Sequence, residues 1–287
     1  MSYLDIIIVL LYFSGLMLLG FYKTTSKIQT DHKGYLLAGR KLSLPGFIAS
    51  LVAAWYGGIL GIGENVYSYG LQTWIIFGLP YYFFALLFAL FFAGKIKDSN
   101  TISLPDHFYN HYGKNAGILS AIYIFILSSP APYILSLGFL IQHFSGLPYE
   151  FSLLTVSIIS ICYLWKGGLS AVIRTDYMQF ILMFAGFVLL LFFSHLHSNQ
   201  TESTILPLPD NFLHPTGGAT FQYILTWFFI ALWTFVDPGF YQRCSAATSK
   251  KTAQKGIFIS ILFWILFDGL TFLTGMYAKL LIVDAQP

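Results

Sequence analysis

The stretch WYGGILGIGENVYSYG, residues 55–70, lies inside a long apolar segment of the kind that forms a membrane helix. It carries Gly57, Gly58, Gly61 and Gly63, followed directly by Glu64. Each glycine costs a helix roughly 1 kcal/mol relative to alanine, and a carboxylate inside a membrane costs about 2.5 kcal/mol or more. We therefore expect this membrane helix to be interrupted near its middle.

The composition around this stretch is that of an integral membrane protein. Only 9% of the residues are charged and 56% are hydrophobic, whereas a soluble domain has about 25% charged residues. Strand-like alternation is absent, so the sequence predicts an all-α membrane protein with a single transmembrane domain over residues 1–287. Eight apolar runs are long enough to span a bilayer: roughly 4–22, 45–70, 71–94, 115–143, 148–165, 170–195, 220–245 and 255–283.

Basic residues mark one side of the membrane. Fourteen of the fifteen Lys and Arg residues fall in alternate loops between the predicted spans, and the long loop 196–219 has none. The positive-inside rule then places these loops in the cytoplasm and the N-terminus outside. The remaining residue, Lys279, lies near the end of the last span, from which its side chain can reach the outer surface.

A second span is also interrupted. In WTFVDPGFYQR, residues 233–243, the sequence Asp237-Pro238-Gly239 stops a helix before its basic end. The two interrupted spans start about 175 residues apart in the sequence and run in opposite directions across the membrane. Such a pair is typical of a transporter whose site lies between inverted repeats.

Four carboxylates lie in or just inside spans, and each has two interpretations. Asp176 is either functional or a helix-start carboxylate that pairs with Arg174, and Glu64 is either functional or simply reaches the outer water. Asp237, at a helix interruption, favours a hard cation. Asp268 has no obvious partner, so a protonated, hydrogen-bonded acid and a functional site are both open.

Several segments are similar to one known family. Four segments resemble motifs of the sodium:solute symporter family: LPGFIASLVAAWYGGILGIGENVYSYGL (44–71), ISLPDHFYNHYG (102–113), GGLSAVIRTDYMQFILMFAG (167–186) and PGFYQRCSAATSKKTAQKG (238–256). The resemblance implies the LeuT-type fold, in which two inverted five-helix repeats follow one leading helix. On that map, 4–22 is the leading helix, 45–195 is the complete first repeat and 220–283 supplies the first two helices of the second. The chain then looks like a truncated product or a fragment of a longer transporter.

The resemblance also implies a sodium site and a solute site. The backbone carbonyls of Ala53 and Tyr56 align with sodium ligands, whose hydroxyl partners would lie beyond residue 287, and Asp176 aligns with an acidic residue near a second cation site. The expected solute site is formed by five residues: Gly57, Leu60, Glu64, Trp233 and Asp237. Leu60, with Ile230, occupies positions that are polar in sugar carriers, so the sugar pattern is not met. Trp233 aligns with an aromatic gating position, and ordinary membrane packing is its alternative role.

The predicted function is sodium-coupled symport of a small polar solute by alternating access, in a multi-pass protein of the cell membrane. Na⁺ is the coupling ion; the lipid bilayer and the solute are the partners, no nucleic acid is expected, and the oligomeric state stays open. Proton coupling at a carboxylate such as Asp176 and an inactive or regulatory role for a truncated chain are the alternatives. A membrane enzyme would need a catalytic cluster, and neither a Ser-His-Asp, a Cys-His nor a zinc spacing is found in the sequence.

Overall fold

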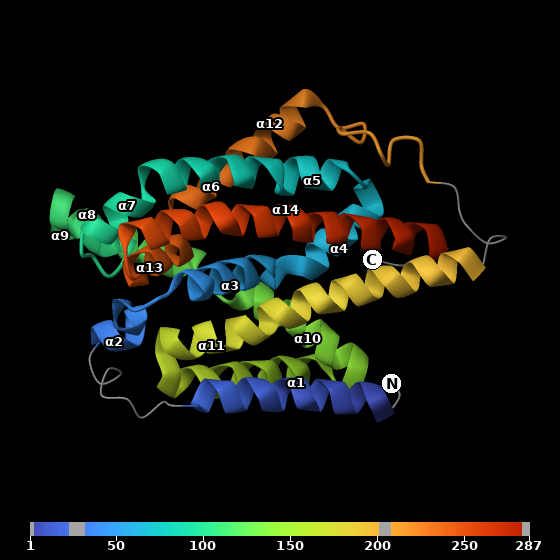
Figure 1. Cartoon of the computed structure of the whole chain (residues 1–287), viewed down its shortest axis with the longest axis horizontal. Helices are drawn as coiled ribbons and strands as arrows, with labels where there is room; N and C mark the ends of the chain where they lie inside the picture. The colour runs from blue at the N-terminus through green and yellow to red at the C-terminus, as the bar shows by residue number, and fades with distance from the viewer. Residues whose placement is uncertain (1–2, 23–31, 201–207, 283–287) are drawn as a thin grey trace. The chain divides into compact units, whose positions relative to one another are not determined.

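The computed structural model describes residues 3–22, 32–200 and 208–282, and these residues are almost entirely helical (Figure 1). The apolar runs form helices because no water is available in a bilayer to satisfy the backbone, which must bond within each helix. Among the described residues, extended pairing is limited to one parallel bridge between Leu42 and Ala247. The lysines of residues 23–31 lie outside the described residues.

Seven of the eight predicted runs appear as helical stretches long and apolar enough to cross a membrane. They are Tyr3–Phe21, Leu44–Tyr69, Gln72–Phe91, Lys114–Ser145, Gly167–Ser198, Phe221–Ala246 and Lys250–Leu281. The eighth run, predicted at 148–165, is described as the shorter apolar helix Tyr149–Cys162. It is the first limb of α11 (Tyr149–Gln200), which changes direction at Gly168.

Gly168 makes that change of direction possible. Its φ of 51° lies in the left-handed region, which costs a side-chain-bearing residue strain. A Cβ atom at this position would also lie only 2.4 Å from the carbonyl oxygen of Tyr35. The Gly-Gly turn in the 167–186 motif is therefore required by both backbone conformation and space.

The chain divides into two compact units. Unit 1 comprises Met1–Gly58, Ala93–Gln179 and Pro238–Gly256, and unit 2 comprises Ile59–Phe92, Phe180–Asp237 and Ile257–Pro287. The passages between the units at Gly58 and at Asp237 coincide with the two predicted helix interruptions. At both positions a helix ends and the chain passes from one unit to the other.

Unit 1 packs around α3 (Leu44–Trp55), the part of the first interrupted span that precedes its interruption. α3 buries Phe47 completely, and Phe47 lies against Gly256, where a Cβ would come within 2.4 Å of its ring. The leading helix α1 (Tyr3–Phe21) contacts the beginning of the second limb of α11, where a Cβ at Gly15 would lie 3.2 Å from the sulfur of Met178. The other elements of unit 1 are α2 (His32–Leu37), η2 (Ala38–Arg40), η3 (Tyr56–Gly58), α7 (Ala93–Asp98), α8 (Leu104–Tyr112), α9 (Lys114–Leu127), α10 (Ala131–Ser145), α13 (Pro238–Ala246) and the start of α14 (Lys250–Leu281).

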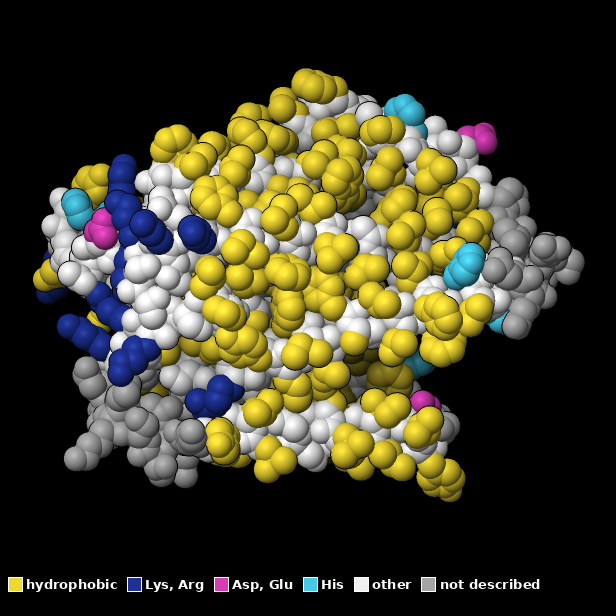
Figure 2. Space-filling model, viewed as in Figure 1, with side chains coloured by type: hydrophobic (Ala, Val, Ile, Leu, Met, Phe, Trp, Pro, Cys, Tyr) yellow, Lys and Arg dark blue, Asp and Glu magenta, His cyan; other side chains and the backbone are white. Residues whose placement is uncertain are grey.

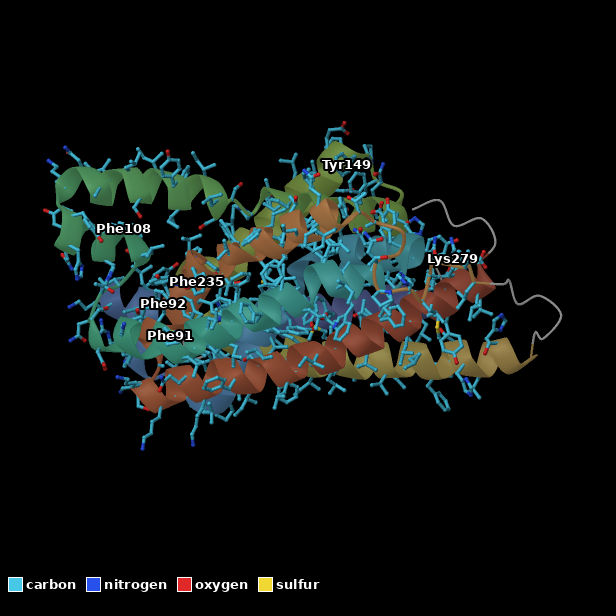
Figure 3. The ribbon with its side chains drawn as sticks, turned by 90° about the horizontal axis from the view of Figure 1, so that it is seen from above. Phe91, Phe92, Phe108, Tyr149, Phe235 and Lys279 are labelled. Atoms are coloured by element: carbon cyan, nitrogen blue, oxygen red, sulfur yellow. The ribbon has the colours of Figure 1, made fainter. Side chains whose placement is uncertain are left out.

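Unit 2 packs around a cluster of phenylalanines. The ring centroid of Phe84 in α6 lies 5.2 Å from that of Phe228 and 5.7 Å from that of Phe235. The rings of Phe92 and Phe235, both labelled in Figure 3, are 5.2 Å apart between centroids. These contacts join α6 to the 3₁₀ segment that precedes the second interruption. The elements of unit 2 are α4 (Ile59–Tyr69), α5 (Gln72–Phe77), α6 (Leu79–Phe91), α12 (Phe221–Ile230), η5 (Ala231–Phe235) and the remainders of α11 and α14.

The surface of the helices is apolar, as a membrane requires. Large hydrophobic side chains such as Leu11, Phe125 and Ile181 are each more than 60% exposed, and yellow side chains cover most of the visible face in Figure 2. Lys and Arg side chains gather at one end of that face, where α7, α13 and the start of α14 lie (Figure 2). Apolar helix surfaces that end in a basic band are those of a multi-pass membrane protein.

Candidate functional site

The first interruption is a single tight turn between two helices. α3 ends at Trp55, residues Tyr56–Gly58 form the 3₁₀ turn η3, and α4 resumes at Ile59. A 3₁₀ turn inside a helix is a recognised mark of a hinge or functional site, because its carbonyls leave the regular α-helical ladder. The predicted interruption is confirmed, and Ala53 and Tyr56 lie at its edge in unit 1.

The four glycines of this stretch differ in what surrounds them. A Cβ at Gly57 would lie 2.7 Å from Cε1 of Tyr133, at the start of α10. A Cβ at Gly58, Gly61 or Gly63 would have no described atom within 4 Å apart from its chain neighbours and its own helix backbone. Gly61 and Gly63 are also inside the regular helix α4. Gly57 therefore allows a close approach of the Tyr133 ring, whereas Gly61 has open space around it. Nothing in the sequence pointed to Tyr133.

A buried polar cluster joins three helices of unit 1. From α13, the Arg243 guanidinium donates from Nε to Ser50 Oγ at 2.9 Å and from Nη2 to Ser50 O at 3.0 Å, so it binds α3 through both side chain and backbone. Its Nη2 atom lies 3.9 Å from Oδ2 of Asp176 on α11, and all three side chains are buried. The Ser50 hydroxyl also faces the Asp176 carboxylate. We call Ser50, Asp176 and Arg243 the polar clip.

This cluster corrects the predicted partner of Asp176. Arg174 does not pair with it: the Arg174 guanidinium donates to the backbone carbonyls of Leu19 and Gly20, at 3.0 and 3.3 Å. Residues two apart on a helix point to different sides, so Arg174 binds α1 while Asp176 turns towards α3 and α13. Sequence proximity alone suggested the wrong arginine.

The second interruption lies in unit 2. η5 (Ala231–Phe235) ends before Asp237, which is outside any helix, and α13 begins at Pro238. Trp233 Nε1 donates to Oδ2 of Asp237 at 3.2 Å, so the structure brings these two predicted solute-site residues together. Next to Trp233, the buried hydroxyl of Thr234 has no hydrogen-bond partner among the described residues. The interruption thus presents a carboxylate, an indole and an unsatisfied hydroxyl.

Two further residues of the predicted solute site lie on α4 in unit 2. Leu60 is 44% exposed and Glu64 is exposed as well. For Glu64 this exposure fits the alternative in which the carboxylate reaches the outer water. Asp268 has the partner that the sequence did not reveal: the hydroxyl of Tyr82 donates to its carboxylate and in turn accepts a bond from Trp74 Nε1 at 3.2 Å.

Two oxygen atoms of the polar clip are of the type that a hard cation such as sodium takes as ligands. Oδ2 of Asp176 is buried and accepts no hydrogen bond from any described residue. A buried carboxylate oxygen without a donor is costly, and carboxylate, hydroxyl and carbonyl oxygens are the donors that hard cations prefer. Asp176 Oδ2 and Ser50 Oγ supply two such oxygens within the polar clip.

The predicted site residues fall into two sets. Ala53, Tyr56, Gly57 and Asp176 belong to unit 1, whereas Leu60, Glu64, Trp233 and Asp237 belong to unit 2. Within unit 1, Asp176 joins Ser50 of α3, one turn before Ala53. That these residues form a sodium site and a solute site stays a prediction.

Comparison with known proteins decides the family. The sequence model of the sodium:solute symporter family matches residues 35–286 of the chain. The chain belongs to this family. The four quoted motifs all lie within this range, so their resemblance to the family is confirmed.

Members of the sodium:solute symporter family with assigned activities are similar along most of this chain. The high-affinity proline transporter PutP of Bacillus subtilis is 28% identical over 280 residues, which cover 91% of this chain and 58% of the relative. The sodium/proline symporter of Staphylococcus aureus is 28% identical over 269 residues, covering 87% of this chain and 51% of the relative. The chain thus spans about half the length of the curated relatives it matches.

A solved structure shows the fold. A substrate-bound, outward-open state of a Na⁺-coupled sialic acid symporter matches 97% of this chain and 60% of its own chain, with a TM-score of 0.76 at 15% identity. The fold of this family member is therefore LeuT-type, as predicted. Membership of a transporter family also sets aside the membrane-enzyme interpretation. The searched part of the structure has no group of three His, Cys, Asp or Glu residues able to hold a metal ion.

Proposed function

We propose that this chain provides the first part of a sodium-coupled symporter that moves a small polar solute by alternating access. On the proposed map it supplies the leading helix, 4–22, the first five-helix repeat, 45–195, and the first two helices of the second repeat, 220–283. The observation that carries the proposal is the polar clip: a buried carboxylate oxygen of Asp176 without a hydrogen-bond donor, held between the inner halves of two interrupted spans.

Sodium in this proposal is held in unit 1. Asp176 contributes its carboxylate, and Ala53 and Tyr56 contribute backbone carbonyls next to η3. When bound, the ion would supply beside Asp176 the positive charge that Arg243 otherwise provides, and its gradient would supply the driving force. A proton on Asp176 is the alternative coupling species.

The solute in this proposal is held at the two interruptions by Gly57, Leu60, Glu64, Trp233 and Asp237. The curated relatives are named as proline carriers, and proline is accordingly the first solute to test. The hydrogen bond from Trp233 to Asp237 supports a joint role for these two residues, since it fixes the indole beside the end of η5.

The proposed topology places the N-terminus outside the cell membrane. Support comes from unit 1 itself, where the N-terminal end of α1 and the band of Lys and Arg side chains lie at opposite ends (Figures 1 and 2). The basic loops are then cytoplasmic.

Thermal unfolding of the purified chain in detergent tests the sodium site. We expect 100 mM sodium to raise the stability relative to 100 mM potassium; a dissociation constant on the order of 10 mM would add roughly 1.4 kcal/mol. Asp176→Asn should abolish the difference, whereas Asp98→Asn, which removes an exposed carboxylate paired with Lys250, should keep it. Equal stability in both salts would refute sodium binding by this chain. A stability that changes with pH equally in both salts, and no longer does so in Asp176→Asn, would favour a proton.

A further inference from the structure

In the polar clip, one arginine both balances the charge of a carboxylate and forms hydrogen bonds to a neighbouring helix. Arg243 lies close enough to Asp176 to neutralise its charge, at 3.9 Å, but is beyond hydrogen-bond distance from Oδ2. Its guanidinium N–H groups instead bind Ser50 twice and the Gly239 carbonyl at 3.3 Å. The arginine therefore balances the carboxylate electrostatically while its hydrogen bonds hold α3 against α13.

The carboxylate is left incompletely satisfied by this arrangement. Asp176 is 5% exposed, and Oδ2 has no hydrogen-bond donor among the described residues. Breaking a buried ion pair leaves an uncompensated charge, so Arg243 cannot withdraw unless another cation takes its place. Conversely, a second cation at Oδ2 would repel the guanidinium strongly at this separation in a buried site.

We propose that Arg243 is an internal cation that competes with sodium for Asp176, so that sodium binding and the hydrogen-bonded clip between α3 and α13 exclude one another. This inference rests on the proposed function, because it takes sodium as the ion that Asp176 binds. It assigns to Arg243 the role of a positioning residue, which acts on the transport cycle through α3 and α13.

The position of the clip gives this competition a mechanical consequence. Ser50 lies six residues before η3 begins at Tyr56, and Arg243 lies six residues after the interruption at Asp237. Both partners thus sit on the unit 1 side of an interruption, on the helical halves α3 and α13. Loss of the hydrogen bonds between Arg243 and Ser50 would allow α3 and α13 to move relative to each other. Sodium binding at Asp176 would therefore release the two helices that lie next to the interruptions.

A sodium titration of the unfolding temperature tests the competition directly. We expect Arg243→Gln to lower the sodium concentration at half effect by about tenfold, because the competing charge is gone. Arg243→Lys, which keeps the charge but loses the planar fork that binds Ser50, should lower it less. Arg174→Gln is the matched control: it removes an arginine two residues from Asp176 that binds α1, and the sodium midpoint should not move.

A native cysteine gives a second readout that needs no change at Arg243. Cys244 is completely buried beside Arg243, whereas Cys162 is exposed. In a Cys162→Ser chain, sodium but not potassium should accelerate alkylation of Cys244 by several-fold, because the clip opens. Asp176→Asn in that background should remove the acceleration.

The outcomes separate this inference from the proposed function. A sodium effect in the wild-type chain with an unchanged or higher midpoint in Arg243→Gln overturns the competition and leaves the sodium site standing. A sodium effect that appears only in Arg243→Gln supports the competition. If neither the wild-type chain nor Arg243→Gln shows a sodium effect, the sodium site and the competition are both overturned. If sodium slows alkylation of Cys244, only the competition is overturned.

Discussion

The contact between Gly57 and Tyr133 makes a prediction whose sign and size follow from geometry. A Cβ at Gly57 would lie 2.7 Å from Cε1 and 2.9 Å from Cδ1 of Tyr133, closer than side-chain carbons approach one another. Overpacking of this kind costs about 1–3 kcal/mol. Tyr133 is 49% exposed, so its ring can move aside, and we expect Gly57→Ala to cost about 1 kcal/mol.

Gly61→Ala is the matched control with the opposite sign. Gly61 is inside α4 and has open space around it, so alanine gains the usual helix preference of roughly 0.5–1 kcal/mol. The two variants should therefore differ by about 1.5–2 kcal/mol. At about 2–4 °C per kcal/mol for a chain of this order of size, their unfolding temperatures in detergent should differ by about 3 °C or more.

A third chain identifies the cause of the loss. In a Tyr133→Ala background the ring is absent, so adding Gly57→Ala should no longer lower the unfolding temperature. Equal unfolding temperatures for Gly57→Ala and Gly61→Ala would refute the packing argument. So would a loss that persists without the Tyr133 ring.

Three further predictions concern other parts of unit 1. Arg174→Gln should speed hydrogen exchange throughout α1, because two charge-assisted bonds to its last turn are lost, each worth about 1.5–3 kcal/mol; exchange that stays unchanged would deny Arg174 this anchoring role. Ser103→Ala should destabilise α8 by about 1 kcal/mol, measured by its exchange protection, since the capping box with Asp106 is lost, and Asp106→Asn should cost less. His107 should titrate below its ordinary pKa of 6.5 by NMR, because burial and then His111 disfavour its charged form; its contribution to stability is therefore lost as pH falls below about 6.5, and a measured pKa above 6.5 would contradict this.

The helical spans followed from sequence because they depend on local properties. Apolar length and the lack of alternation fix a membrane helix without knowledge of its neighbours, and the predicted runs agree with the described helices to within a few residues at most ends. The interruptions were equally local, since glycine and proline act on their own backbone. The run at 148–165 is the exception: it shares the continuous element α11 with the next span, and only the conformation of Gly168 separates the two limbs.

Contacts between residues far apart in the chain could not be predicted from the sequence. Nothing local distinguishes Gly57, where an added Cβ would meet Tyr133, from Gly61, where an added Cβ would have open space. Likewise Arg174 and Arg243 are both arginines near the ends of spans, and only the packing of α11 against α3 and α13 decides that Asp176 faces Arg243.

The sequence by itself determined that this is a helical membrane protein of the sodium:solute symporter family with two interrupted spans, because hydrophobicity, backbone-breaking residues and motifs are written along the chain. Only the tertiary structure decided which charges neutralise one another, and it assigned Ser50 and Arg243 to the same cluster as Asp176 across 193 positions of sequence. The physical reason is that a buried charge is stabilised by whichever opposite charge the tertiary packing brings close to it. The distance between two such residues cannot be read from the sequence around either one.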